Sequence, residues 1–574
     1  MLTTRARIRA LPTSFFQRLM MGHSPKSEYD DSDIVQQGRP PERWKGRAGA
    51  NKYRGKMAVG SACCATPAAS NLPSFVPGSQ AQPENKPAAA PVLRRFKTYR
   101  IKRFLGNISF VVLLNLLVKP AWVVLENVVQ DRLGHEVFGT FTALLTLATI
   151  VAGISDLGTT QLTTKRLAAA PGFFQEYFPT LLPLRVGLGV GFLGATVGVG
   201  WALGYRGHWL LLLAITAAGL LLTQYMLFLR GVLQAHQRFN TDAVLSVLER
   251  LLLLGLVLAL LPLGLTLDRY VGVRTVAVGF TFLLLLVLIR RFYGRVALRP
   301  RWEQVRQVLL DSWPLALITL VYGLNERVDM LMLERLVSAK EASYYAAAYR
   351  WVDAVMMYLW TVLPLFFARF AHATGRRQEQ QDLLWFGQRV VTVPLLFVVG
   401  FGLFRGELLF FQFAHSTPAE VARMTQCLQL LFLNVLVHAF FALYSTLLTS
   451  TDHEKPVSWL VTGSIALNVG LNFLLMPRYG ALAGAANTLL CAVVVSVGYV
   501  WLVPRRTGVQ LPWAMLLRLG LVFGGLCGGW YLLRTYAGLP WWLETALAGL
   551  WLLALVAGLG VVKPSEIRQL RGKA

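Results

Sequence analysis

The sequence predicts an all-α polytopic membrane protein, and three observations support this prediction. Of its 574 residues, 55% are hydrophobic and only 15% are charged, whereas a soluble domain carries about 25% charged residues. Apolar runs of about 20 residues, long enough to cross a bilayer as helices, recur from Phe104 onward. The connections between these runs are too short to hold a soluble domain. We therefore expect about 14 transmembrane helices.

Residues 1–93 differ from the rest of the chain and are expected to form a disordered, basic, Pro/Ala-rich tail. Residues 1–103 hold 19 Lys/Arg against 6 Asp/Glu, and small and polar residues dominate. Such a composition buries too little apolar surface to fold. The basic start resembles a transit peptide, and translation from a later residue such as Met57 is the alternative.

The apolar spans suggest how the membrane part is organised. We expect an N-terminal lobe at residues 94–292 with six spans and a C-terminal lobe at 293–503 with six more. Residues 504–574 hold the last two spans and the C-terminus. The spans are expected at about 104–125, 138–157, 178–203, 209–229, 243–266, 271–292, 308–328, 343–367, 386–404, 427–450, 457–476, 480–503, 514–534 and 541–562.

A weak internal repeat relates the two lobes. Asp131-Arg132-Leu133, followed by Phe138-Gly139, comes after the first span. Glu334-Arg335-Leu336, followed by Ser343-Tyr344, comes after the seventh. Because the copies lie six spans apart, they cross the membrane in the same direction. This pattern predicts two six-helix lobes related by a parallel pseudo-repeat, plus two C-terminal helices.

The formal charge of +27 indicates orientation in a membrane rather than nucleic-acid binding. Nucleic-acid recognition needs a basic face on a folded polar domain, and no such domain is evident. Lys and Arg are more frequent in the even-numbered connections between spans, and the basic segment Arg94–Arg103 precedes the first span. By the positive-inside rule, both termini are expected in the cytoplasm.

The sequence has no pattern typical of an enzyme or a metalloprotein. It contains no P-loop, and its five cysteines do not have the spacing of a metal site. We therefore expect no catalytic residues, no cofactor and no metal ion.

Charged residues inside apolar spans are candidates for function, because they are costly in lipid. Arg350 and Asp353 are three residues apart on one helix face and could pair, either as a structural salt bridge or around a substrate. Glu249 and Arg250 are adjacent and point apart, so each needs a partner on another helix. Lys119 precedes a proline deep in the first span.

Other features of the spans favour structural roles. His438 is expected to be a packed, hydrogen-bonded histidine rather than a proton relay. Arg185 lies near a span end and could reach the interface by snorkelling. Two GxxxG-type steps favour close helix contact in the third span, at Gly187, Gly191, Gly194 and Gly198.

Short motifs in a characteristic order extend from about Phe104 to Val562. They include Val118-Lys119-Pro120, Leu133-Gly134-His135-Glu136-Val137-Phe138-Gly139, Ser155-Asp156-Leu157-Gly158, Ser246-Val247-Leu248-Glu249-Arg250, Arg327-Val328-Asp329-Met330, Tyr345-Ala346-Ala347-Ala348-Tyr349-Arg350 and Pro477-Arg478-Tyr479-Gly480. With these motifs the chain resembles Wzx-type polysaccharide (oligosaccharide) flippases of the multidrug/oligosaccharidyl-lipid/polysaccharide (MOP) flippase superfamily. The long tail departs from the pattern of that family.

The resemblance implies a transporter that flips undecaprenyl-pyrophosphate-linked oligosaccharide, the repeat unit of a polysaccharide or O-antigen, by alternating access through a central cationic cavity. A pyrophosphate needs Lys or Arg in a desolvated cavity. Lys119, Arg250, Arg327 and Arg350 can supply these cations. We expect the carboxylates Glu249, Asp329 and Asp353 to couple transport to an ion or to form structural ion pairs.

The resemblance also implies a location and partners. We expect the bacterial inner (cytoplasmic) membrane, a lipid-linked oligosaccharide as substrate, and sodium or a proton as coupling ion. Polysaccharide-assembly enzymes are the expected protein partners, and nucleic acid is not expected.

Two alternatives remain open. A drug/cation antiporter of the MATE type would need a cation site centred on carboxylates, whereas deep basic residues outnumber deep acids here. A membrane glycosyltransferase or ligase acting on the same lipid would need a large external loop, and the widest one, Arg405–Gln426, is short.

Overall fold

The computed structural model describes residues 120–160, 162–163, 167, 173–236, 238–293, 300–451 and 453–561. The predicted tail and Lys119 lie outside the described residues. The chain divides into one unit of residues 1–102 and a second of residues 103–574, and everything below concerns the second unit. We call its described residues 120–293 the first half and 300–561 the second half.

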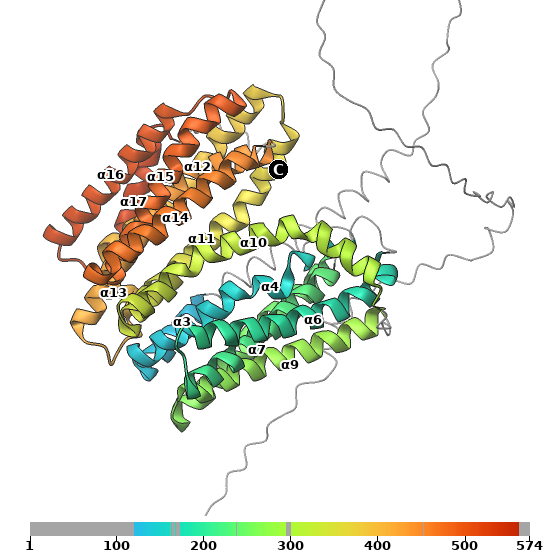
Figure 1. Cartoon of the computed structure of the whole chain (residues 1–574). Coiled ribbons are helices and arrows are strands. Elements are labelled where there is room, and N and C mark those ends of the chain that lie inside the picture. The colour runs from blue at the N-terminus through green and yellow to red at the C-terminus, as the bar shows by residue number, and fades with distance from the viewer. Residues whose placement is uncertain are drawn as a thin grey trace, which may run out of the picture. The chain divides into compact units, whose positions relative to one another are not determined.

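The first half is helical throughout its main elements, and no strand occurs in the described residues (Figure 1). Residues 120–133 are helical, and Gly134, with φ 81°, allows the chain to turn before the next helix. The following helices are α3 (His135–Val151), α4 (Gly153–Asp156), α6 (Phe173–Ala202), α7 (Gly207–Ala235), α8 (Phe239–Leu260) and α9 (Leu267–Tyr293).

The second half contains eight further α-helices among the described residues. Ser338 and Thr417 each accept a hydrogen bond from a backbone N–H in the first turn of the helix that follows, which fixes where α11 and α13 begin. The helices are α10 (Trp302–Leu336), α11 (Ala339–His372), α12 (Arg377–Arg405), α13 (Pro418–Ser450), α14 (Glu454–Tyr479), α15 (Ala481–Thr507), α16 (Trp513–Tyr536) and α17 (Trp541–Gly558).

Twelve of the fourteen predicted membrane spans are confirmed. Within the described residues, 12 helices are long and apolar enough to cross a membrane, and each coincides with one of the fourteen predicted spans. The first predicted span lies mostly outside the described residues. The seventh corresponds to α10, which has 35 residues. Most helices are longer than the predicted spans; α11, for example, has 34 residues.

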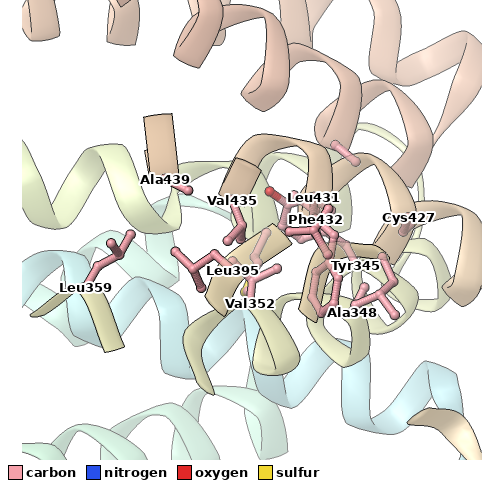
Figure 2. Packing of buried hydrophobic residues seen from close by; sticks show 14 of the residues in the cluster. Tyr345, Ala348, Val352, Leu359, Leu395, Cys427, Leu431, Phe432, Val435 and Ala439 are labelled. Atoms are coloured by element: carbon pink, nitrogen blue, oxygen red, sulfur yellow. The ribbon is translucent and has the colours of Figure 1, made fainter. Parts of the chain in front are cut away.

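The core of the second half lies between α11, α12 and α13. Tyr345, Val352, Leu431 and Phe432 are almost fully buried there and pack against Leu395 (Figure 2). Because lipid tails are as apolar as these side chains, close packing rather than the hydrophobic effect holds such helices together. The outer faces instead expose large apolar side chains, which is the surface expected next to lipid.

The last two helices, α16 and α17, are fastened to α12. Trp530 of α16 is fully buried and contacts Phe397, Phe401 and Phe404. Arg405, at the end of α12, forms an ion pair with Glu544 of α17, a side chain that is 1% exposed. Loss of Arg405 would leave this buried carboxylate unpaired, which is strongly destabilising.

Helix α10 packs into both halves. Val308, near its start, joins a hydrophobic cluster of the first half, and Gln304 accepts a hydrogen bond of 2.6 Å from Thr180 of α6. Met330 and Leu333, near its end, belong to the core of the second half.

The two halves also meet through α3, which packs against α10 and α11. Gly139 of α3 lies next to the backbone of Ala339, at the start of α11. We call the contact of residues 126–139 with residues 339–350 and 412–420 the junction.

The glycine steps predicted to mediate close helix contact in the third span do not do so. A Cβ at any of these four positions would meet nothing within 4 Å. Two neighbouring glycines of α6 make the close approaches instead, Gly189 to Tyr225 and Gly200 to Leu213. The four predicted glycines therefore lie on an open face of α6. The tightly packed face of this helix is the one that carries Gly189 and Gly200.

Candidate functional site

Glu126 lies at the centre of a charged cluster that connects three helices. Its carboxylate accepts hydrogen bonds from Tyr270 Oη at 2.6 Å and from Arg274 Nη1 at 3.0 Å, both on α9. On its other side, Arg350 Nε of α11 lies 4.0 Å from Glu126 Oε2. Two guanidinium groups thus share one carboxylate, and the cluster carries a net charge of one plus.

Arg350 belongs to the second half, but its side chain contacts residues of the first half. Nη1 donates a 2.6 Å hydrogen bond to Asn127 Oδ1, and the guanidinium lies 4.7 Å from the centre of the Phe138 ring. Asn127 also donates to Gln412 Oε1, at 3.4 Å. The Arg350 side chain keeps 15% of its surface exposed.

This arrangement suits the binding of an anion. Guanidinium groups bind phosphate oxygens through paired, charge-assisted hydrogen bonds. Arg274 is 28% exposed and Arg350 15%, so each has part of its surface free for a ligand. Glu126 is only 8% exposed and lies between them.

The pairing of Arg350 with Asp353 that the sequence suggested does not form. Asp353 Oδ2 instead lies 3.6 Å from Arg327 Nη2, whose guanidinium lies 5.9 Å from the centre of the Tyr349 ring. Both side chains of this pair are about one-third exposed. Arg350 and Asp353 do lie three residues apart on one helix, but Asn127 and Glu126 are the partners of Arg350, and Arg327 is the partner of Asp353.

Asp329 is a buried carboxylate held by neutral groups. It accepts hydrogen bonds from Tyr345 Oη at 3.0 Å, Asn472 Nδ2 at 2.7 Å and Thr488 Oγ1 at 2.8 Å. Asn472 also donates to Asn468 Oδ1, at 2.8 Å. Neutral donors solvate the carboxylate but leave its charge uncompensated, and a buried charge of this kind is stabilised when a cation or a proton neutralises it.

Asp329 and Asp353 both line a cavity of about 410 Å³ inside the second half. Neither Lys nor Arg is among its described lining residues. Asn434 Oδ1 is buried there without a hydrogen-bond partner, and His438 Nδ1 lies 3.0 Å from the backbone oxygen of Asn434. The cavity therefore offers acceptors and carboxylates, the chemistry that suits a cation. His438 has the backbone hydrogen bond expected of a packed histidine.

Glu249 and Arg250 lie on α8, and Glu249 is near enough to Arg274 of the charged cluster to interact with its charge. Arg250 Nη1 is buried without a hydrogen-bond partner, and Arg250 makes no contact with Glu126 or Arg350 among the contacts of the described residues. Its predicted role in a shared cationic site therefore stays a prediction.

A layer of polar contacts lies beside the charged cluster in the junction. Asp131 accepts a 3.0 Å hydrogen bond from the backbone N–H of His415, whose Nδ1 lies 2.6 Å from the same carboxylate. His135 lies between Ser416, at 2.9 Å, and Ser343, at 3.1 Å. These contacts connect one side of the junction to the other next to the charged cluster.

Tyr205 adds a contact between the halves near the junction. Its hydroxyl donates a 3.0 Å hydrogen bond to Glu334, and Arg335 lies 3.7 Å above its ring. Burial, together with the Glu334 carboxylate, raises the pKa of Tyr205 well above its usual value. The hydroxyl thus remains a donor over the whole physiological pH range.

Three residues of the charged cluster, Glu126, Asn127 and Arg274, were not among the predicted site residues, and Arg185 was placed wrongly. Arg185, expected to snorkel, is instead 2% exposed and forms an ion pair with Asp156. The available signal for Arg274 was its position inside the span expected at 271–292, since a charge within an apolar span is costly in lipid.

Comparison with known proteins agrees with this description. The family model for polysaccharide biosynthesis proteins matches residues 104–367. None of the curated proteins matches the sequence.

Two solved structures share the fold. A lipid II flippase MurJ in an inward closed conformation is 12% identical, with a TM-score of 0.64 over 78% of this chain and 97% of MurJ. An inward-facing multidrug resistance MATE family transporter of the MOP superfamily is 15% identical, with a TM-score of 0.57 over 68% of this chain and 93% of the transporter. Both are transport proteins rather than enzymes.

The family match and the fold agree with the resemblance inferred from the sequence. The chain is a multi-pass membrane protein with the fold of the MOP-superfamily flippases and transporters, and its residues 104–367 match the polysaccharide biosynthesis protein family.

Proposed function

We propose that this protein flips an oligosaccharide linked to undecaprenyl pyrophosphate across the bacterial cytoplasmic membrane. The observation that supports this best is the cluster in which Arg274 and Arg350 share the single carboxylate of Glu126. A net positive charge where the two halves meet suits the diphosphate of such a lipid.

The match of residues 104–367 to polysaccharide biosynthesis proteins favours a glycan-bearing lipid. The fold shared with MurJ and MATE transporters favours alternating access of two lobes. In this proposal Arg274 joins the predicted substrate-binding cations Lys119, Arg250, Arg327 and Arg350.

We further propose that a cation couples to transport at Asp329, either sodium or a proton. The support is the burial of this carboxylate among neutral donors and its position in the wall of the acceptor-rich cavity. Glu249 and Asp353 are secondary candidates, and Asp353 already pairs with Arg327.

The orientation and the partners complete the proposal. The basic even-numbered connections favour cytoplasmic termini, and in this orientation the junction lies on the extracytoplasmic side. Assembly enzymes of the same polysaccharide would supply the lipid-linked unit and consume it.

A drug/cation antiporter is the second candidate, because Asp329 and Asp353 line a cavity without Lys or Arg among its described residues. That cavity lies inside the second half, however, whereas the junction between the halves carries the cationic cluster. The anionic substrate therefore remains the better fit. The glycosyltransferase alternative loses support, since the solved structures that share the fold are transport proteins.

Proteoliposomes containing a fluorescent pyrophosphate-linked lipid test the proposal. Wild type should move the lipid between leaflets, Arg350→Gln should do so much more slowly, and Arg518→Gln, on the surface of α16, should match wild type. Equal rates in protein-containing and empty vesicles would exclude the flippase, and exchange of an organic cation for sodium or protons would favour the antiporter.

A further inference from the structure

Arg350 stands out because the residues that hold it belong to the opposite half of the protein. It lies on α11, yet it donates to Asn127 at 2.6 Å, lies 4.0 Å from Glu126 and is 4.7 Å from the Phe138 ring. Other ion pairs of the first half, such as that of Arg230 with Asp242, form within it.

The residues that contact Arg350 are connected to the other polar contacts of the junction. Asn127, which accepts from Arg350, also donates to Gln412 at 3.4 Å. Gln412 lies three residues from His415, whose backbone N–H donates to Asp131. The segment from Glu126 to Asp131 therefore contacts both Arg350 and His415 of the second half.

Withdrawal of Arg350 from the junction would leave Glu126 paired, although Asn127 Oδ1 would lose its donor. Glu126 keeps its hydrogen bonds from Tyr270 and Arg274, which lie in the same half, so one carboxylate still faces one guanidinium. Arg350 itself would become a poorly compensated charge in a largely buried place, and such a charge is costly. Separation of the halves at the junction is therefore unfavourable unless another anion takes over Arg350.

We infer that Asn127 and Glu126 hold Arg350 in place of the substrate anion, and that a diphosphate binding to Arg350 releases the junction. The inference rests on the proposed function. Asn127 is then a positioning residue, which acts on substrate through Arg350. An empty transporter stays closed at the junction, and a loaded one opens.

Spin labels across the junction test this inference. The positions are Leu263→Cys in the first half, where Leu263 is 69% exposed, and Ala419→Cys, an exposed position in the 412–420 segment of the junction. In the full-length chain, Cys63, Cys64 and Cys527 are replaced by serine, while Cys427 and Cys491 are buried and remain. The probe is farnesyl pyrophosphate, with farnesol as the uncharged control.

Two substitutions of Asn127 should act in opposite directions. Asn127→Asp adds a carboxylate against Arg350, so it should lower the affinity for farnesyl pyrophosphate about ten- to hundredfold and keep the label distance short. Asn127→Leu should lengthen the distance without ligand and leave the affinity undiminished. Gln510→Glu makes the same amide-to-carboxylate change at an exposed position in the connection after α15 and should behave as wild type in both measurements.

Wild type should show a longer label distance with farnesyl pyrophosphate and an unchanged one with farnesol. If the probe binds but the distance stays the same, or if Asn127→Asp binds it as tightly as wild type, the inference is wrong while the proposed substrate class stands. If wild type does not bind the probe at all, the proposed function fails and the inference with it. Thermal unfolding of each variant separates these results from loss of folding.

Discussion

Gly139 of α3 lies so close to Ala339 of α11 that a Cβ on Gly139 would collide with the Ala339 carbonyl oxygen. The two backbones are therefore in direct contact at the junction. This contact lies close to the hydrogen-bonded layer of His135 and Ser343, so it defines how near the two halves can approach.

Any side chain at position 139 should weaken the closed junction. Gly139→Val forces α3 and α11 apart, and overpacking of this kind costs about 1–3 kcal/mol. Hydrogen exchange at the backbone N–H of His415, which donates to Asp131, should accelerate by about five- to a hundredfold. Gly191→Ala is the control, because a Cβ there meets nothing within 4 Å. Unchanged exchange in Gly139→Val would show that the contact does not hold the junction closed.

Arg274 and Arg350 should both be needed for anion binding, with different effects on stability. Each change to Gln should weaken binding of a pyrophosphate lipid about ten- to hundredfold. Arg274→Gln also strips Glu126 of its closest cation, which should destabilise the fold by roughly 3–5 kcal/mol for a fully buried pair and less here, since Arg274 is 28% exposed.

The double variant Arg274→Gln with Glu126→Gln separates the two effects of Arg274. It should recover much of the thermal stability while binding stays weak. If binding also recovers, Arg274 has a structural role only and does not bind the anion.

The ion pair of Arg327 with Asp353 should contribute little to stability. Both side chains are about one-third exposed, and such pairs are worth about 0–1 kcal/mol. In a double-mutant cycle, Arg327→Gln and Asp353→Asn should therefore couple weakly in thermal unfolding. Asp353→Asn should also fail to recover the thermal stability that Arg350→Gln loses. A recovery would support the Arg350–Asp353 pair that the sequence suggested.

Asp329→Asn should uncouple transport from its driving ion while leaving the fold nearly intact. Asparagine has the same shape and keeps an acceptor for Tyr345 and Thr488, but it lacks the charge that a cation would neutralise. Transport measured against sodium concentration and against pH should lose one of these dependences. Asp268→Asn, at an exposed carboxylate, is the control, and an unaltered ion dependence in Asp329→Asn would remove Asp329 from the coupling role.

Reporter fusions should locate the junction relative to the cytoplasm. A fusion after Gly375, between α11 and α12, and one after Arg301, before α10, should report the cytoplasm. One inserted after Ala419 should report the opposite side. An external signal from Gly375 would invert the orientation and place the junction on the cytoplasmic face.

The sequence predicted the helices well because the bilayer acts on each span separately. The length and hydrophobicity of a run decide whether it crosses, with no knowledge of its neighbours. The ends were less accurate, since several helices continue beyond the apolar core; α12, for example, extends over Arg377–Arg405, whereas its span was expected at 386–404.

The site could be predicted only as a set of candidate residues. Arg350 was matched with Asp353 because both lie on one helix face, yet it donates to Asn127, 223 residues away. Contacts of that kind depend on how whole helices pack. Asp329 was predicted as a coupling or ion-pair carboxylate, but its neutral donors come from three other helices, and no local pattern shows them.

The two copies of the internal repeat meet each other at the junction. Gly139 of the first copy contacts Ala339 of the second, and His135 lies against Ser343. A contact between equivalent segments has the geometry of the self-complementary interface in a two-fold dimer, here formed within one chain. Substitutions on one copy are thus felt by the other, so among related proteins the residues at positions 135 and 139 should vary in step with those at 343 and 339.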